Sequence, residues 1–86
     1  MQEYTLEIKQ AALKAILRLP KTIQARIHAR IEGLKSDPRP KSCRKLEGEE
    51  RAYRVRLGDY RIVYEVWDKQ IHVIVINVGH RKDIYR

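Results

Sequence analysis

The sequence predicts an α+β domain in which two helices pack on one face of a mainly antiparallel sheet. Two observations lead to this fold class. Two stretches with apolar residues at helical spacing come early in the chain, and stretches that alternate between apolar and polar residues follow them. Such segregation of helices and strands along the chain is typical of α+β folds. With 86 residues, the chain is long enough for one domain, residues 1–86, and too short for two.

The first half of the chain is predicted to form a short strand and then a helical hairpin. Residues 4–8 alternate between apolar and polar side chains, as a strand does. Helical spacing then relates four apolar residues, Ala12, Leu13, Ile16 and Leu17. Pro20 should separate this helix from the next, because the residue before a proline avoids the helical region and proline is tolerated in a first helical turn. The second helix has the clearest apolar stripe, made of Ile23, Ile27, Ile31 and Leu34.

An irregular connection and a β-hairpin are predicted next. Residues 36–51 contain two helix-breaking prolines and many charges, which favours an irregular segment. Residues 53–57 and 60–66 alternate on either side of Gly58-Asp59, a two-residue turn with glycine first that suits a type II′ hairpin. A further strand over 71–78 would complete a three-stranded antiparallel meander.

The predicted hairpin places three arginines on one face of the sheet. The turn puts Arg56 opposite Arg61 and Arg54 opposite Val63, and directly opposed residues share a face. We therefore expect Arg54, Arg56 and Arg61 to cluster on the face away from the helices. Arginines directly across a sheet repel each other, so the cluster favours an anion, and the guanidinium fork matches phosphate oxygens. The alternative is a solvated face that is merely basic.

The last strand is predicted to follow a second two-residue turn at residues 68–69. This turn would place Arg61 opposite Ile76. Three apolar side chains would then adjoin the arginines: Val63, Ile74 and Ile76. These side chains would either pack under another segment or form an exposed patch for a partner.

Composition narrows the classes of function and the expected location. The formal charge of +8 attracts polyanions such as nucleic acid, ribosomes, anionic membranes or acidic proteins. No apolar run approaches the roughly 20 residues that span a bilayer, and the N-terminus has no export signal. With Cys43 as the single cysteine, these features predict a cytoplasmic protein that does not enter a membrane. Histidines and cysteine lack metal-ligand spacing and no glycine-rich phosphate loop is present, so neither metal nor cofactor is expected.

Four short motifs follow one another in the second half of the chain. They are Lys45-Leu46-x-Gly48, Tyr53-Arg54-x-Arg56, Gly58-Asp59-Tyr60-Arg61-x-x-Tyr64 and Val78-Gly79-His80-Arg81-x-x-x-Tyr85. In this order, behind two amphipathic helices, they resemble the RelE/ParE superfamily of bacterial toxins over nearly the whole chain. The resemblance implies a RelE-like fold and the toxin component of a toxin–antitoxin system.

The two branches of this superfamily imply different activities. RelE-type members are ribosome-dependent endonucleases that cut mRNA by attack of a ribose 2′-hydroxyl on the adjacent phosphate, without a metal, and a cognate antitoxin holds each inactive. The resemblance therefore implies an RNA endonuclease whose partners are the ribosome, mRNA and an antitoxin. ParE-type members share the fold but poison DNA gyrase, and a gyrase-binding inhibitor is the alternative. The combination of Arg81, Tyr85 and the three arginines favours the nuclease.

The resemblance also implies roles for individual residues. Arg61 and Arg81 would stabilise the charge that builds on the phosphoryl oxygens during cleavage. Tyr85 would stack on or orient the nucleotide, or else pack at the C-terminus. Substrate binding would be the role of Arg54, Arg56 and Lys45.

The general base of the implied reaction is left open. The positions of Arg54 and Arg56 are basic in the family, often lysine, and are assigned to proton transfer and phosphate binding. Arginine stays protonated, with a pKa above about 12, and is a poor base. His80 is the best alternative, because its ordinary pKa near 6.5 suits proton transfer at neutral pH. A solvent-exposed histidine at a strand end is the other interpretation of His80.

Overall fold

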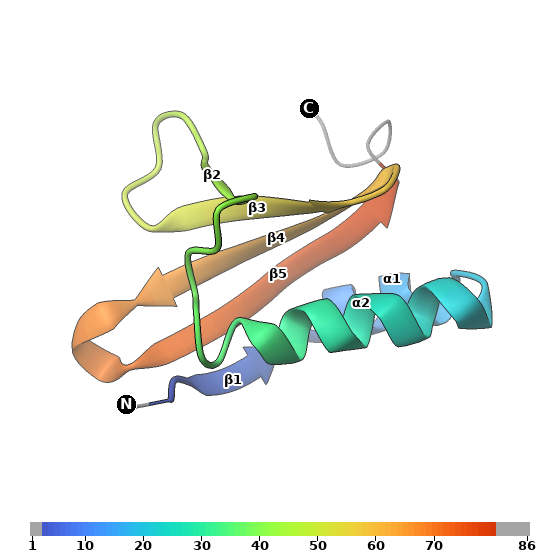
Figure 1. Ribbon diagram of the computed structural model, residues 1–86, viewed down its shortest axis with the longest axis horizontal. Helices are drawn as coiled ribbons and strands as arrows, with labels where there is room; N and C mark the ends of the chain where they lie inside the picture. The colour runs from blue at the N-terminus through green and yellow to red at the C-terminus, as the bar shows by residue number, and fades with distance from the viewer. Residues whose placement is uncertain (1–2, 81–86) are drawn as a thin grey trace.

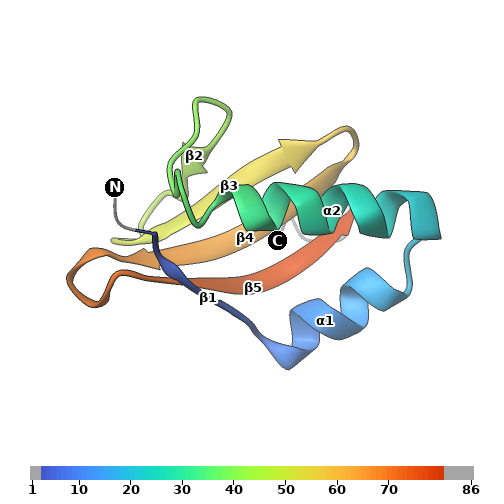
Figure 2. The same cartoon turned by 60° about the horizontal axis from the view of Figure 1, so that its bottom comes forward.

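In the computed structural model, which describes residues 3–80, five strands form one mixed sheet and two helices lie along one of its faces (Figure 1, Figure 2). The strands are β1 (Thr5–Ile8), β2 (Arg44–Lys45), β3 (Ala52–Leu57), β4 (Tyr60–Trp67) and β5 (His72–His80). The helices are α1 (Gln10–Leu17), α2 (Lys21–Gly33) and the short 3-10 helix η1 (Asp68–Gln70). The strand order is β1-β5-β4-β3-β2, with β1 parallel to β5 and the other neighbours antiparallel. The predicted α+β fold is confirmed.

The helical hairpin breaks where the sequence predicts. α1 ends at Leu17, and Pro20 is the N-cap residue of α2. Proline offers no side-chain oxygen to cap the helix, and the side chain of Gln24 instead fixes the turn. Its Nε2 donates a hydrogen bond to the carbonyl oxygen of Leu19 at 2.8 Å.

The hydrophobic core fills the space between the two helices and the sheet. The apolar stripes of α1 and α2 meet alternate residues of β3, β4 and β5, as the periods of helix and strand require. Core residues that are no more than 1% exposed include Ile16, Ile27, Ile31, Val55, Ile62, Tyr64, Val73 and Val75. The residues between them along each strand therefore lie on the outer face of the sheet, away from the helices.

The predicted register of the first hairpin is confirmed. Arg56 is opposite Arg61 and Arg54 is opposite Val63. Gly58, in the turn, has a φ of 61°, a left-handed conformation that glycine adopts without a steric penalty. A turn this short permits only one register between β3 and β4, and this register decides which side chains share the outer face.

The predicted two-residue turn between β4 and β5 is wrong. The chain passes through η1 and then Ile71, whose φ of 52° is left-handed. This longer connection places His72 opposite Trp67. This connection could not be predicted from the sequence, because Ile71 occupies a left-handed conformation that a β-branched residue rarely adopts.

A β-bulge displaces the register of β4 and β5 a second time. The irregularity lies between Val63 and Tyr64, and it brings Gly79 opposite Arg61, where Ile76 was expected. The predicted apolar group beside the arginines is therefore dispersed: Val63 lies opposite Asn77 and Ile74 opposite Glu65. Arg61 has a neighbour without a side chain instead of a bulky one.

The connection over residues 36–51, predicted as irregular, contains the edge strand β2. Two polar contacts fix its first part to the rest of the fold. The hydroxyl of Tyr64 donates a hydrogen bond to the carbonyl oxygen of Pro38 at 2.7 Å. Asp68 Oδ1 accepts hydrogen bonds from Arg39 Nη2 at 2.8 Å and from the hydroxyl of Tyr4 at 2.7 Å. These bonds, with that of Arg39 the larger, lower the pKa of Asp68.

Candidate functional site

Four arginines lie together on the outer face of the sheet, and we call them the arginine surface. Arg44 in β2 is opposite Arg54 in β3, and Arg56 in β3 is opposite Arg61 in β4. Arg54 and Arg56 share a face because they are two residues apart along one strand. The structure thus brings together the three arginines that the sequence predicts and adds Arg44.

The arginine surface concentrates positive charge. Two pairs of like charges stand directly across neighbouring strands, an arrangement that costs stability by itself. Clustered guanidinium groups raise the local potential and attract polyanions, and each can hold phosphate oxygens in a bidentate manner. A phosphate backbone is therefore the ligand for which this surface is best suited.

Arg61 is the buried member of the arginine surface. Its side chain is only 7% exposed, whereas Arg56 and Arg44 are exposed. The neighbouring position on β5 is Gly79, which has no side chain. Burial restricts the conformations of the Arg61 side chain, so its charge is held in one place before any ligand binds. This is the property expected of a group that stabilises charge in a transition state.

The end of β3 that carries Arg56 is fixed to the helical layer. Arg30 of α2 donates a hydrogen bond from Nη1 to the carbonyl oxygen of Arg56 at 2.8 Å. The bond reaches the main chain, so the side chain of Arg56 stays on the outer face with Arg54 and Arg61.

The structure does not bring His80 to the arginine surface. His80 is opposite Tyr60, and the two rings contact edge to face with centroids 5.7 Å apart. Tyr60 packs against the core under the helices, so His80 lies on the helical side of the sheet. There it lines a pocket with Arg18 and Leu19 of the turn after α1.

The other predicted site residues are placed as follows. Lys45 is opposite Tyr53, so it faces the side of the sheet away from Arg44, its neighbour in β2. Arg81 and Tyr85 lie outside the described residues. Arg44 was missed because two strand residues within a charged connection leave no periodic signal in the sequence.

Within residues 3–80, no three side chains of His, Cys, Asp or Glu are grouped so that they could hold a metal ion. No helix in that part of the chain is long and apolar enough to cross a membrane.

Comparisons with known proteins point to one group of proteins. A family model described as the ParE toxin of type II toxin–antitoxin systems, parDE, matches residues 6–85. The chain is 33% identical to the putative toxin RelE1 of Methanocaldococcus jannaschii over 88 residues, which cover 98% of this chain and 97% of that relative. It is 32% identical to the mRNA interferase toxin RelE of Escherichia coli K12 over 81 residues, 92% of this chain and 84% of that relative.

Solved structures give the same result. A chain of the archaeal RelE–RelB complex from Pyrococcus horikoshii matches with a TM-score of 0.83 and 31% identity, covering 94% of this chain and 98% of that one. The isolated RelE toxin of Escherichia coli matches with a TM-score of 0.78 and 32% identity, covering 90% of this chain and 83% of that one. The similarity in sequence and the similarity in fold therefore point to the same proteins, and both extend over nearly the full length of this chain.

Proposed function

Because the chain belongs to the RelE/ParE superfamily of type II toxin–antitoxin toxins, we propose that it is a ribosome-dependent endonuclease that cleaves mRNA. The observation that carries the proposal is the arginine surface, with Arg61 buried among three further arginines. Relatives named as RelE toxins and an mRNA interferase support the nuclease branch. Poisoning of DNA gyrase, the ParE-type activity, remains an outcome of the test below.

The proposed reaction needs charge stabilisation more than any other form of catalysis. The 2′-oxygen of a ribose forms a bond to the adjacent phosphorus, and the bond from phosphorus to the 5′-oxygen breaks. The products are a 2′,3′-cyclic phosphate and a 5′-hydroxyl, with one proton lost from the 2′-oxygen and one gained by the 5′-oxygen. Negative charge builds on the phosphoryl oxygens in between, where Arg61 would stabilise it and Arg54 and Arg56 would hold the neighbouring phosphates.

We also propose a cognate antitoxin as partner. The solved complexes that resemble this chain pair RelE with RelB. A chain with a formal charge of +8 favours an acidic, amphipathic segment on its surface. Such a segment would compete with RNA for the arginine surface and would in this way keep the toxin inactive.

Primer extension on an mRNA, with and without ribosomes, tests the proposed function. We expect cuts within codons only when ribosomes are present. A domain of this size has few groups with which to align the 2′-hydroxyl, phosphate and leaving oxygen, and alignment accounts for a large part of such catalysis. Rapid, specific cleavage of naked mRNA at the same protein concentration would contradict the ribosome requirement. Inhibition of gyrase supercoiling without any RNA cleavage would support the ParE-type activity instead.

A His80→Gln variant tests the proton-transfer residue. If His80 is the base, the variant loses most of its activity. His80 lies beside Tyr60 on the helical side of the sheet, away from the arginine surface. We therefore expect His80→Gln to change the single-turnover rate only slightly. Tyr60→Phe is the matched control, because it keeps the ring contact with His80 and removes only a hydroxyl.

A further inference from the structure

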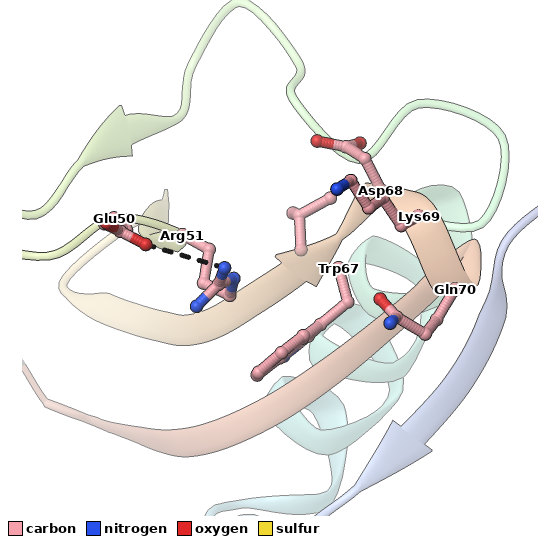
Figure 3. Close-up of a pocket in the computed structure, with 7 residues that line it drawn as sticks. Glu50, Arg51, Trp67, Asp68, Lys69 and Gln70 are labelled. Atoms are coloured by element: carbon pink, nitrogen blue, oxygen red, sulfur yellow. Dashed lines mark ion pairs between the residues drawn. The ribbon is translucent and has the colours of Figure 1, made fainter.

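A pocket of ≈ 440 Å³ lies at the far end of β4, beside η1 (Figure 3). Trp67, the last residue of β4, and Arg51, just before β3, are among the side chains that line it. The guanidinium carbon of Arg51 lies 4.2 Å from the centroid of a Trp67 ring, a cation–π contact. Neither residue belongs to the arginine surface or to the motifs that resemble the toxin family.

The indole of Trp67 is held in one orientation. Its Nε1 donates a hydrogen bond to Glu65 Oε1 at 2.9 Å. The main chains that carry the two side chains are also joined, because the backbone nitrogen of Val66 donates a hydrogen bond to the carbonyl oxygen of Arg51 at 2.9 Å. Arg51 is held less firmly, because its ion pair with Glu50 spans 3.5 Å and its side chain is 44% exposed. The pocket thus combines a fixed aromatic ring with a cation that can move.

Trp67 lies on the same face of the sheet as the arginine surface. Arg61, Val63, Glu65 and Trp67 alternate along β4 with the core residues of that strand. At about 3.3 Å per residue, Trp67 lies roughly 20 Å from Arg61 along the strand. A single RNA strand of a few nucleotides can therefore reach from one site to the other.

The charges around the pocket differ from those of the arginine surface. Glu50 and Asp68 line the pocket with Arg51 and Lys69, so the pocket has no excess of positive charge with which to hold a phosphate. A planar base has no charge to be repelled and can stack on an indole or on a guanidinium. One outer face thus offers a site suited to phosphates and a site suited to a base.

We propose that Trp67 and Arg51 form a stacking site for one unpaired base of the RNA strand whose phosphates lie on the arginine surface. The base takes the place of the guanidinium over the indole, and Arg51 moves to cover its other side. An exposed cation–π contact strengthens an association about 2- to 5-fold. A base–aromatic stack strengthens it about 5- to 150-fold, so the exchange is favourable.

The fluorescence of Trp67 tests the proposal directly, because it is the one tryptophan of the chain. A short, unstructured RNA labelled with fluorescein reports binding through its anisotropy. We expect the Trp67 emission to be quenched with the same midpoint as the rise in anisotropy. An abasic oligomer of equal length and charge should bind through its phosphates without this quenching.

Two substitutions at position 67 separate stacking from packing. Trp67→Leu should weaken binding of the RNA about 5- to 150-fold and leave binding of the abasic oligomer unchanged. Trp67→Phe keeps an aromatic ring and should bind the RNA within a few-fold of the parent. Arg26→Gln, on the exposed side of α2, is the control for loss of a cation: binding of both oligomers should weaken alike, with the quenching intact.

Three results would overturn the stacking site. They are saturation of RNA binding without any change in Trp67 emission, equal quenching by the abasic oligomer, and quenching by an acidic antitoxin peptide but not by RNA. The choice of RNA rests on the proposed function, but the two can fail separately. Loss of the stacking site leaves ribosome-dependent cleavage in place, and absence of cleavage leaves the quenching measurable.

Discussion

Arg61→Gln is expected to lower the single-turnover rate of mRNA cleavage on the ribosome by about 10²-fold or more, with little change in ribosome binding. The charge of Arg61 contributes most when negative charge on the phosphoryl oxygens is greatest, which is in the transition state. Because the side chain is 7% exposed, its position is set before the substrate arrives. Glutamine keeps a polar, hydrogen-bonding side chain, although a shorter one, and removes the positive charge.

Arg56→Gln is the matched control for this experiment. Arg56 is directly opposite Arg61 and loses the same charge, but it is exposed. We expect this variant mainly to weaken binding of mRNA. The slope of the logarithm of the binding constant against the logarithm of the salt concentration should fall by about one, because about one counterion fewer is released on binding. A single-turnover rate for Arg61→Gln equal to that of the parent, with an unchanged free energy of unfolding, would make Arg61 an ordinary basic side chain.

Tyr64→Ala should lower the free energy of unfolding by about 3–5 kcal/mol, in the range of large aromatic-to-alanine changes in a core. Tyr64 is fully buried, and its ring stacks on Tyr53 with centroids 5.9 Å apart. Its hydroxyl also bonds to Pro38 at 2.7 Å. The loss is large against the 5–15 kcal/mol that is typical of small domains, and urea unfolding followed by Trp67 fluorescence would measure it.

Tyr64→Phe isolates the hydroxyl from the ring. This variant keeps the packing but leaves the carbonyl oxygen of Pro38 without its donor, so we expect a loss of about 1–3 kcal/mol. Burial raises the pKa of Tyr64 above its usual value. The folded protein therefore holds this proton more tightly than the unfolded chain does. The contribution of the neutral Tyr64 hydroxyl to the free energy of unfolding is fully present below about pH 10 and is lost as the pH rises further.

The alkaline loss of stability provides the control for this pair of variants. Tyr64→Phe has no proton to lose at position 64, so its stability should fall less steeply than that of the parent above pH 10. Parallel curves for the two proteins would show that ionisation of Tyr64 plays no part. A Tyr64→Ala variant as stable as Tyr64→Phe would contradict the packing contribution of the ring.

The part of the site that could be predicted from sequence is the part that depends on local geometry. A two-residue turn with a glycine allows one pairing of the strands on either side, so the opposition of Arg56 and Arg61 followed directly. The second turn depends on Ile71 in a left-handed conformation, and the bulge near Val63 leaves no composition signal. Their combined shift placed Gly79 beside Arg61, which no periodicity argument could reveal.

Residues that depend on contacts between distant segments were also out of reach. Arg44 joins the arginine surface only because the charged connection folds back on β3 as an edge strand. Trp67 and Arg51 are sixteen residues apart, and only the folded hairpin brings them to 4.2 Å. The helices and the core, by contrast, follow from apolar spacing alone, because burial of one stripe decides the orientation of the whole element.

The parallel pairing of β1 with β5 limits when this protein can fold. Thr5 is opposite His72, so the first strand is paired with a segment that is synthesised 67 residues later. While the nascent chain grows, β1 and both helices exist without the strands on which they pack, and closing so long a loop slows the final step. The sheet is therefore completed only after β5 has been made. The N-terminal strand of the nascent chain is thus left without its neighbour until β5 has emerged from the ribosome.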